Sequence, residues 1–303
     1  MSFEDLSIVG RATSFESQFA HTEQFETVGG TAEVVDIRPE ENLDTDVPVF
    51  LAPAWASTLE IYKPALRTIT EQKRRAISLN HPRFGGDMSD TAEEMLEKYP
   101  EEELRKALTI LDILDQKGID KIDVIAHSEG AINTAIAASI HPEKFRSIVF
   151  VAPAGMIGED TFTRLAEGFR SQSSKTETTT RMPFTEAQRE VAQVYIKEIL
   201  AYLKNPIRSV KEGMDISKSQ IHDMLRYLHE KGIGIVVLSG VDDPVFPMNK
   251  MQEIAKADML DGFLSLRGGH GELGVRPELF VTAATDMLAK LEVKKQKDAE
   301  RTG

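Results

Sequence analysis

Three side chains that can act together in nucleophilic catalysis occur in the order Ser128, Asp243 and His270. Each follows an apolar run of strand length, which places each at the carboxyl end of a predicted strand. Ligands of open parallel sheets bind outside these ends, so the three side chains are expected at one edge of the sheet. There a histidine can take the proton of a serine hydroxyl, while a carboxylate fixes the tautomer of the imidazole. The three residues therefore predict acyl transfer through a serine nucleophile.

Ser128 lies where an apolar run, Ile122 to Ile125, gives way to a helix of small residues. The segment AHSEG matches the G-x-S-x-G nucleophile elbow, except that Ala126 stands in place of the first glycine. Such a turn strains the serine backbone so that Oγ projects above the sheet, and small flanking residues let strand and helix approach each other. A serine at this junction can also be a simple N-cap. Its downstream partners favour the nucleophile.

Two adjacent aspartates, Asp242 and Asp243, follow the strand predicted over residues 233–240. Neighbouring side chains of an extended chain point in different directions, so only one of them can reach the histidine. Pro244 restricts Asp243 to extended geometry and favours it as the acid. Glu159 and Asp160 follow another strand and are the alternative acids.

The composition excludes several classes of function. The chain has 303 residues, no cysteine, a net charge of −13 and an isoelectric point near 5.1. The charge argues against nucleic acid as a partner, and the lack of cysteine excludes disulfides and thiolate chemistry. We find neither a signal-peptide core nor an apolar segment of spanning length, and expect a cytoplasmic protein with no membrane span. No spacing indicates a metal site or a cofactor, and association into a homo-oligomer stays open.

Strand and helix patterns alternate along most of the chain. This alternation predicts an α/β fold with a mostly parallel sheet covered by helices on both faces. Near the start, Gly29-Gly30 predicts a hairpin over residues 25–37. Further strands are predicted at 48–55, 75–79, 122–125, 145–154, 233–240 and 262–266, and helices at 58–72, 91–117 with a break near Pro100, 248–260 and 277–291.

Over residues 24–291 the sequence resembles the α/β-hydrolase superfamily. Four segments carry the resemblance: the AHSEG elbow, SGVDDPVFP after a late strand, the GGH near the end, and the LNHPRFGG loop. The resemblance implies Ser128 as nucleophile, His270 as base and Asp243 as the orienting acid. Asp243 fits the superfamily's G-x-x-D-x-x-x-P spacing, whereas Asp242 does not.

The resemblance also implies an oxyanion hole made of two backbone N–H groups. One is that of Glu129, at the start of the helix that follows the nucleophile. The other comes from the turn after the PVFL strand, where the usual His-Gly is replaced by Pro53-Ala54 and then Trp55. Whether Trp55 or Ala54 supplies this donor stays open, and Ala54 is also a candidate pocket residue.

A polar, strand-poor segment at 156–231, helical over 185–203 and 216–230, interrupts the alternation. In the superfamily a lid is inserted at this place, so we expect a helical lid. The expected organisation is a hydrolase core at 24–155 and 232–291, a lid at 156–231, an N-terminal extension at 1–23 and a disordered tail at 292–303.

The other histidines have less specific positions. His81 follows a strand and is a candidate pocket residue. His127 adjoins the nucleophile, but elbow geometry turns it away from the site, so a packing role is expected. His141, His222 and His229 lie on or beside helices and are expected outside the site. The acidic run between residues 87 and 118 is interpreted as a solvated face without function.

Together these features predict a serine hydrolase that cleaves an ester-type bond of a small molecule, a carboxylester, lactone or thioester, through an acyl-enzyme. A carbon–carbon bond hydrolase with the same triad is the first alternative. A non-catalytic ligand-binding protein on the same fold is the second.

Overall fold

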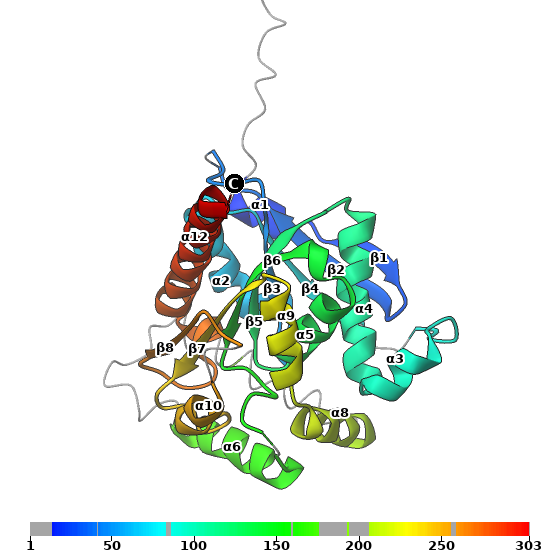
Figure 1. The fold of residues 1–303 in the computed structure, drawn as a ribbon. Coiled ribbons are helices and arrows are strands. Elements are labelled where there is room, and N and C mark those ends of the chain that lie inside the picture. The colour runs from blue at the N-terminus through cyan, green and yellow to red at the C-terminus, as the bar shows by residue number, and fades with distance from the viewer. Residues whose placement is uncertain are drawn as a thin grey trace, which may run out of the picture.

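A computed structural model describes residues 14–40, 42–82, 86–158, 160–175, 193, 206–255 and 259–302. Its centre is an eight-stranded sheet in the order β1-β2-β4-β3-β5-β6-β7-β8 (Figure 1). The strands from β3 to β8 run parallel, and β2 pairs antiparallel with both β1 and β4. The predicted fold class, a mostly parallel sheet between two layers of helices, is confirmed.

The strands lie close to their predicted positions. The hairpin forms with Thr27 opposite Gly30, and Gly30 has a φ of 109°, a left-handed value that suits glycine. The central strands β3, β5 and β7 are buried over their whole length, as helices on both faces require. The strands are β1 Glu23–Thr27, β2 Gly30–Ile37, β3 Val49–Ala52, β4 Ala76–Asn80, β5 Ile122–His127, β6 Phe145–Val151, β7 Gly234–Gly240 and β8 Gly262–Leu266.

Two layers of helices cover the sheet, and each encloses its own apolar core (Figure 1). One layer contains α2 (Leu59–Glu71), α12 (Pro277–Thr302) and the short helices α1 (Phe15–Phe19) and α11 (Glu272–Val275). The other contains α4 (Glu101–Gln116), α5 (Gly130–Ile140) and α9 (His222–Glu230). A short α3 (Glu93–Lys98) precedes α4, so the predicted break near Pro100 is confirmed.

Two further helices of the insertion, α6 (Phe162–Lys175) and α8 (Pro206–Lys218), lie with α10 (Met248–Ile254) below the carboxyl ends of the strands (Figure 1). The chain leaves the core and returns to it at one place, because the N–H of Ile221 donates to the carbonyl of Gly155 at 3.1 Å. Helix α9 packs against α5 and β7 and therefore belongs to the covering layer. The helix expected at 185–203 lies outside the described residues, apart from residue 193. None of the described helices is long and apolar enough to cross a membrane.

The prediction of a disordered tail at 292–303 is wrong, since α12 continues to Thr302. The segment consists largely of Glu, Lys, Gln, Ala and Arg, which favour a helix. Its first turn is also fixed to the body. Glu292 pairs with Arg146 at 2.6 Å, and Lys294 pairs with Asp261 at 2.5 Å.

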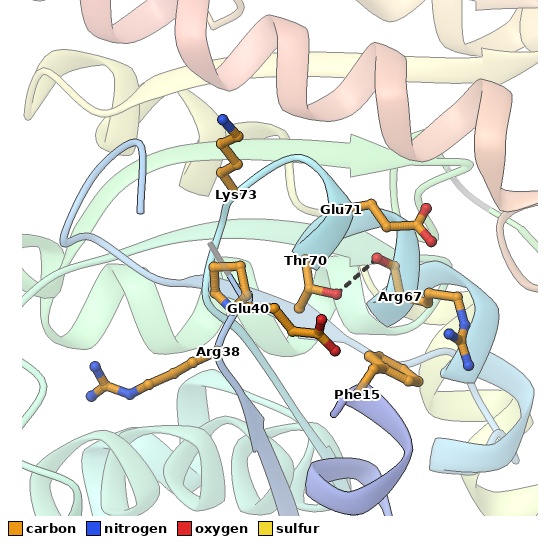
Figure 2. A pocket seen from close by; sticks show the side chains of 8 residues that line it. Phe15, Arg38, Glu40, Arg67, Thr70, Glu71 and Lys73 are labelled. Atoms are coloured by element: carbon orange, nitrogen blue, oxygen red, sulfur yellow. Dashed lines mark hydrogen bonds between the residues drawn. The ribbon is translucent and has the colours of Figure 1, made fainter. Parts of the chain in front are cut away.

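Figure 2 shows a hollow with Arg38, Arg67 and Lys73 around it. It lies between α1, the end of α2 and the chain after β2, with Phe15 and Thr70 on its wall. Ile37 at the end of β2 pairs with Ala76, the first residue of β4, so this is the amino edge of the parallel strands. Its lining includes none of Ser128, Asp243 and His270.

Candidate active site

Ser128 sits at a strained corner between β5 and α5. Its φ is +54°, a left-handed value that a residue with a Cβ adopts only when its surroundings enforce it. Two hydrogen bonds of 3.0 Å fix the corner: the Ser128 N–H donates to the carbonyl of Val151, and the Ala154 N–H donates to the carbonyl of Ser128. This backbone is that of the nucleophile elbow.

Gly130 explains why the elbow needs a small residue two positions after the serine. A Cβ at this position would lie 2.5 Å from the carbonyl oxygen of Ala52 and 2.7 Å from that of Pro53. Both atoms are backbone at the end of β3, so they cannot move aside cheaply. The glycine therefore allows α5 to start in contact with the turn that follows β3.

The structure brings Ser128, His270 and Asp243 into one hydrogen-bonded chain. The Oγ of Ser128 lies 2.9 Å from Nε2 of His270, and Nδ1 of His270 lies 2.9 Å from Oδ2 of Asp243. The other carboxylate oxygen of Asp243 accepts the N–H groups of Val245 at 2.7 Å and Phe246 at 3.0 Å. A carboxylate can only accept, so His270 carries its proton on Nδ1 and presents Nε2 as the acceptor of the serine proton.

The alternative acids lie elsewhere. Asp242 is exposed, and its N–H donates to the carbonyl of Gly268. Asp160 is paired with Arg164, four residues further along, and Arg164 also donates to the carbonyl of Val245 at 2.8 Å. Glu159 lies outside the described residues.

The turn after β3 has one backbone donor already in use. The N–H of Ala54 donates to the hydroxyl of Tyr62 at 3.0 Å, a contact buried within the core. The N–H of Trp55 therefore becomes the candidate oxyanion donor of this turn. Ala56, the next residue, has a φ of +55°, so the chain turns sharply directly after Trp55. Glu129 is the N-cap residue of α5, where backbone N–H groups point out of the helix.

Helix α6 packs against His270 and Trp55 from the insertion side. The ring of Phe169 meets His270 edge-on with centroids 5.6 Å apart, and the ring of Trp55 lies 5.9 Å from Phe169. The Oε1 of Gln172 accepts the backbone N–H of His270 at 3.2 Å. As a result, Ser128 is only 3% exposed and the His270 side chain is fully buried.

A cluster of charged side chains is buried beside the elbow, and the sequence analysis missed it. Nζ of Lys106 lies 2.6 Å from Oε1 of Glu129 and 3.8 Å from Oε2 of Glu212 on α8. The same Glu212 oxygen accepts Nε1–H of Trp55 at 2.9 Å. Glu103, one turn before Lys106 on α4, is also fully buried. The interpretation of residues 87–118 as a solvated face is therefore wrong for Glu103 and Lys106, which share the inner face of α4.

The protonation states within this cluster follow from burial and from the neighbouring charges. Burial raises the pKa of Glu103 well above its ordinary value, and the nearby Glu129 adds to the shift, so both effects favour the neutral acid. Burial also raises the pKa of Glu212 to about 7, although Lys106 acts against it. Burial opposes the charge of Lys106, but the surrounding glutamates outweigh it and raise the lysine's pKa. One ammonium thus faces several carboxyl groups that compete for it.

His81 and His127 both have buried ring nitrogens. Burial, followed by repulsion from Lys106, lowers the pKa of His81 well below its ordinary value, and its ring nitrogens contact no hydrogen-bonding partner among the described residues. His127 packs beneath the elbow, where burial and the neighbouring His270 lower its pKa to about 3. Both rings are therefore neutral near pH 7.

The remaining histidines contact other groups. His141 pairs with Glu143, His222 contacts the carbonyl of Met156, and His229 lies 3.7 Å from Asp261. In the part of the chain that the structure describes, no three His, Asp or Glu side chains are gathered in a way that could hold a metal ion.

Comparison with known proteins identifies the family. Residues 47–270 match the family model described as alpha/beta hydrolase fold. A search of curated proteins gave no match.

Among solved structures, the esterase EaEST from Exiguobacterium antarcticum has a TM-score of 0.64 at 12% identity, covering 90% of this chain and 100% of that one. A bromoperoxidase from Bacillus anthracis has a TM-score of 0.62 at 14% identity, covering 89% and 100%. The CarC serine hydrolase involved in carbazole degradation has a TM-score of 0.61 at 16% identity, covering 89% and 99%. These TM-scores establish a shared fold. The family match over most of the chain shows that the protein belongs to the α/β-hydrolase family.

Proposed function

We propose that the protein is a serine hydrolase that cleaves ester-type bonds through an acyl-enzyme. The observation that carries this proposal is the continuous hydrogen-bonded chain from Ser128 through His270 to Asp243, with the serine at a left-handed corner. A serine hydroxyl acts as a nucleophile only when a base takes its proton, and Nε2 of His270 is in position to do so. The names of the similar esterases are consistent with this reaction class.

In the proposed reaction Oγ of Ser128 bonds to the carbonyl carbon while its proton moves to Nε2 of His270. The resulting imidazolium lies against the carboxylate of Asp243, which stabilises the positive charge. The C–O bond to the leaving group then breaks, and the proton on Nε2 passes to the departing alkoxide. Water next attacks the acyl-enzyme with His270 again as the base, which returns the serine and releases the acid.

The negative charge of the tetrahedral intermediate needs two donors beside Ser128. We assign these to the N–H groups of Glu129 and Trp55, on the two chain segments that Gly130 allows to touch. Loss of one such donor typically costs about 3 kcal/mol of barrier. Because the Ala54 N–H is used by Tyr62, the geometry favours Trp55 as the second donor.

Residues 156–220 serve as a cap in this proposal. The segment starts and ends at the contact between Gly155 and Ile221, as an insertion into a complete core would. Its helix α6 places Phe169 against His270, and its helix α8 places Glu212 against Trp55. The described walls near the site carry the aromatic rings of Trp55 and Phe169, so the proposed substrate is a small ester with an apolar part.

The direct test is labelling with a fluorophosphonate, followed by mass spectrometry of the modified peptide. We expect one adduct on Ser128, hydrolysis of p-nitrophenyl esters by the wild-type protein, and loss of both in Ser128→Ala. Far-UV circular dichroism should show that the variant is folded. A wild-type protein that is neither labelled nor active on an ester panel of increasing chain length would refute the proposal, as would full ester turnover by Ser128→Ala.

A further inference from the structure

A second hydrogen-bonded chain runs beneath the first. Tyr62, on α2, accepts the N–H of Ala54 at 3.0 Å, and its hydroxyl lies 2.6 Å from Nδ1 of His127. Nε2 of His127 lies 2.9 Å from the backbone carbonyl oxygen of His270. The Tyr62 side chain is fully buried and His127 is 1% exposed, so water cannot replace these contacts. The chain connects the turn after β3, the end of β5 and the loop after β8.

The donor and the acceptor of each of these hydrogen bonds are fixed by the two backbone groups at the ends, the N–H of Ala54 and the carbonyl of His270. The carbonyl oxygen of His270 can only accept, so the proton of His127 must be on Nε2. A neutral imidazole carries one N–H, and His127 is neutral because burial lowers its pKa to about 3. Nδ1 is therefore an acceptor, and the hydroxyl of Tyr62 donates to it. The same hydroxyl oxygen accepts from Ala54, so each group has a partner for the role it must play.

The contacts at the two ends are next to the reacting groups. Ala54 precedes Trp55, whose N–H is the proposed oxyanion donor. His270 is held at its backbone by His127, at its N–H by Gln172 and at its ring by Asp243. His127 itself adjoins Ser128. One buried series of hydrogen bonds thus connects the turn after β3 with the backbone of His270 through a residue next to Ser128.

We propose that Tyr62 and His127 are positioning residues. They hold the turn after β3, which carries the proposed oxyanion donor Trp55, and the backbone of His270 at the correct distance from Ser128. This assignment rests on the proposed serine hydrolase function. Neither side chain hydrogen-bonds to the reacting atoms, and the His127 ring also packs against the ring of His270 with centroids 5.3 Å apart, so both act through the groups they hold. Small displacements of such groups change turnover, because about 1 Å of misplacement can cost on the order of 100-fold in rate.

Tyr62→Phe is the sharpest probe, since it retains the ring and removes only the hydroxyl. It leaves the Ala54 N–H and the Nδ1 of His127 buried without their partner. We expect kcat for a p-nitrophenyl ester to fall about 10- to 100-fold while KM changes less than about twofold. Rates are to be expressed per folded enzyme, with unfolding followed by circular dichroism. Ile69→Val, a small change in the same helix and also fully buried, is the matched control and should leave kcat unchanged.

Variants of His127 provide an independent test in case Tyr62→Phe folds poorly. His127→Gln retains an amide N–H that can reach the His270 carbonyl, whereas His127→Leu has no donor. We expect kcat in the order wild type, His127→Gln, His127→Leu. The fall in kcat of the double variant Tyr62→Phe/His127→Leu should be no larger than that of the more impaired single variant. Both changes interrupt the same series of hydrogen bonds, so their effects should not add.

The outcomes separate this assignment from the proposed function. If wild type hydrolyses esters and Tyr62→Phe and His127→Leu retain its kcat within about twofold, the positioning role is refuted and the hydrolase stands. Lower melting temperatures with unchanged kcat would likewise reduce both residues to packing. If the wild-type protein neither hydrolyses esters nor reacts with a fluorophosphonate, the proposed function fails and the assignment fails with it.

Discussion

Replacing Glu212 with glutamine should remove a pH-dependent loss of folding stability. The loss arises where Glu212, on α8, contacts Trp55 in the turn after β3. The carboxyl is fully buried, and its pKa is raised by burial from 4.5 to about 7. The groups that face it are Lys106 and Glu102 on α4, Glu129 at the elbow, and the indole N–H of Trp55. Lys106 and Trp55 favour the ionised form, whereas burial and the two glutamates oppose it.

The sign and size follow from linkage. The folded protein holds the Glu212 proton more tightly than the unfolded chain does, so protons bound in the folded state favour folding at low pH. This contribution is complete below pH 4.5 and is lost as the pH rises to about 7. The difference between 4.5 and about 7 corresponds to about 3 kcal/mol at most. A glutamine can still accept from Trp55 and never ionises, so Glu212→Gln avoids the loss.

The assay is urea unfolding of both proteins at intervals from pH 4.5 to 8, with the stability difference plotted against pH. We expect Glu212→Gln to gain about 2–3 kcal/mol relative to wild type across this range. Taking the difference cancels the titrating groups that do not interact with Glu212, whereas Glu103 and Lys106 do interact with it and their response is part of the measured difference. Glu94→Gln, which removes an exposed carboxylate from α3, is the control for a Glu→Gln substitution at the surface. A flat difference for Glu212→Gln would refute the reasoning, since Lys106 would then compensate the buried charge fully.

Asp243→Asn should lower kcat about 10⁴-fold with little change in fold, because the amide no longer holds the Nδ1–H tautomer of His270. Asp242→Asn should lower kcat less than about tenfold. Steady-state kinetics that reverse this order would assign the acid to Asp242 instead. Gly130→Ala should lower the free energy of unfolding in urea by about 1–3 kcal/mol and abolish most turnover. The added Cβ would lie 2.5 Å from the carbonyl oxygen of Ala52. A variant with wild-type stability and turnover would exclude this close contact. Replacement of residues 158–219 by a short Gly/Ser linker should leave a folded core with an altered ester range, since both ends of the segment meet at one place; an unfolded product would make the segment part of the core.

The parts of the molecule that follow from local pattern could be predicted from the sequence. The alternation of apolar runs and amphipathic stretches predicted the sheet, and the order of Ser128, Asp243 and His270 predicted that three strand ends would meet. The buried cluster could not be predicted this way. Glu103 and Lys106 stand in an acidic helix, and their burial depends on Glu129 and Glu212, which are distant in sequence.

The contact between Tyr62 and His127 escaped prediction for a related reason. A packing role was expected for His127 because elbow geometry turns it away from Ser128. Its actual partners come from α2 and from the loop after β8, and no local pattern indicates them. The spacing of Glu103 and Lys106 with Ala107 and Ile110 on one helical face was the one available sign of burial, because this spacing puts charged residues on the apolar stripe of α4.

The order of the reacting groups along the chain has a consequence for biosynthesis. The proposed nucleophile, Ser128, precedes the proposed base, His270, by 142 residues, and the whole insertion is made between Ser128 and Asp243. His270 follows β8, the last strand to be translated and an edge strand of the sheet. Until β8 has paired with β7, the emerging polypeptide carries an ordinary hydroxyl at Ser128. In the proposed reaction a nascent or prematurely terminated product is therefore chemically silent, and the serine becomes a nucleophile only when the last part of the sheet is in place.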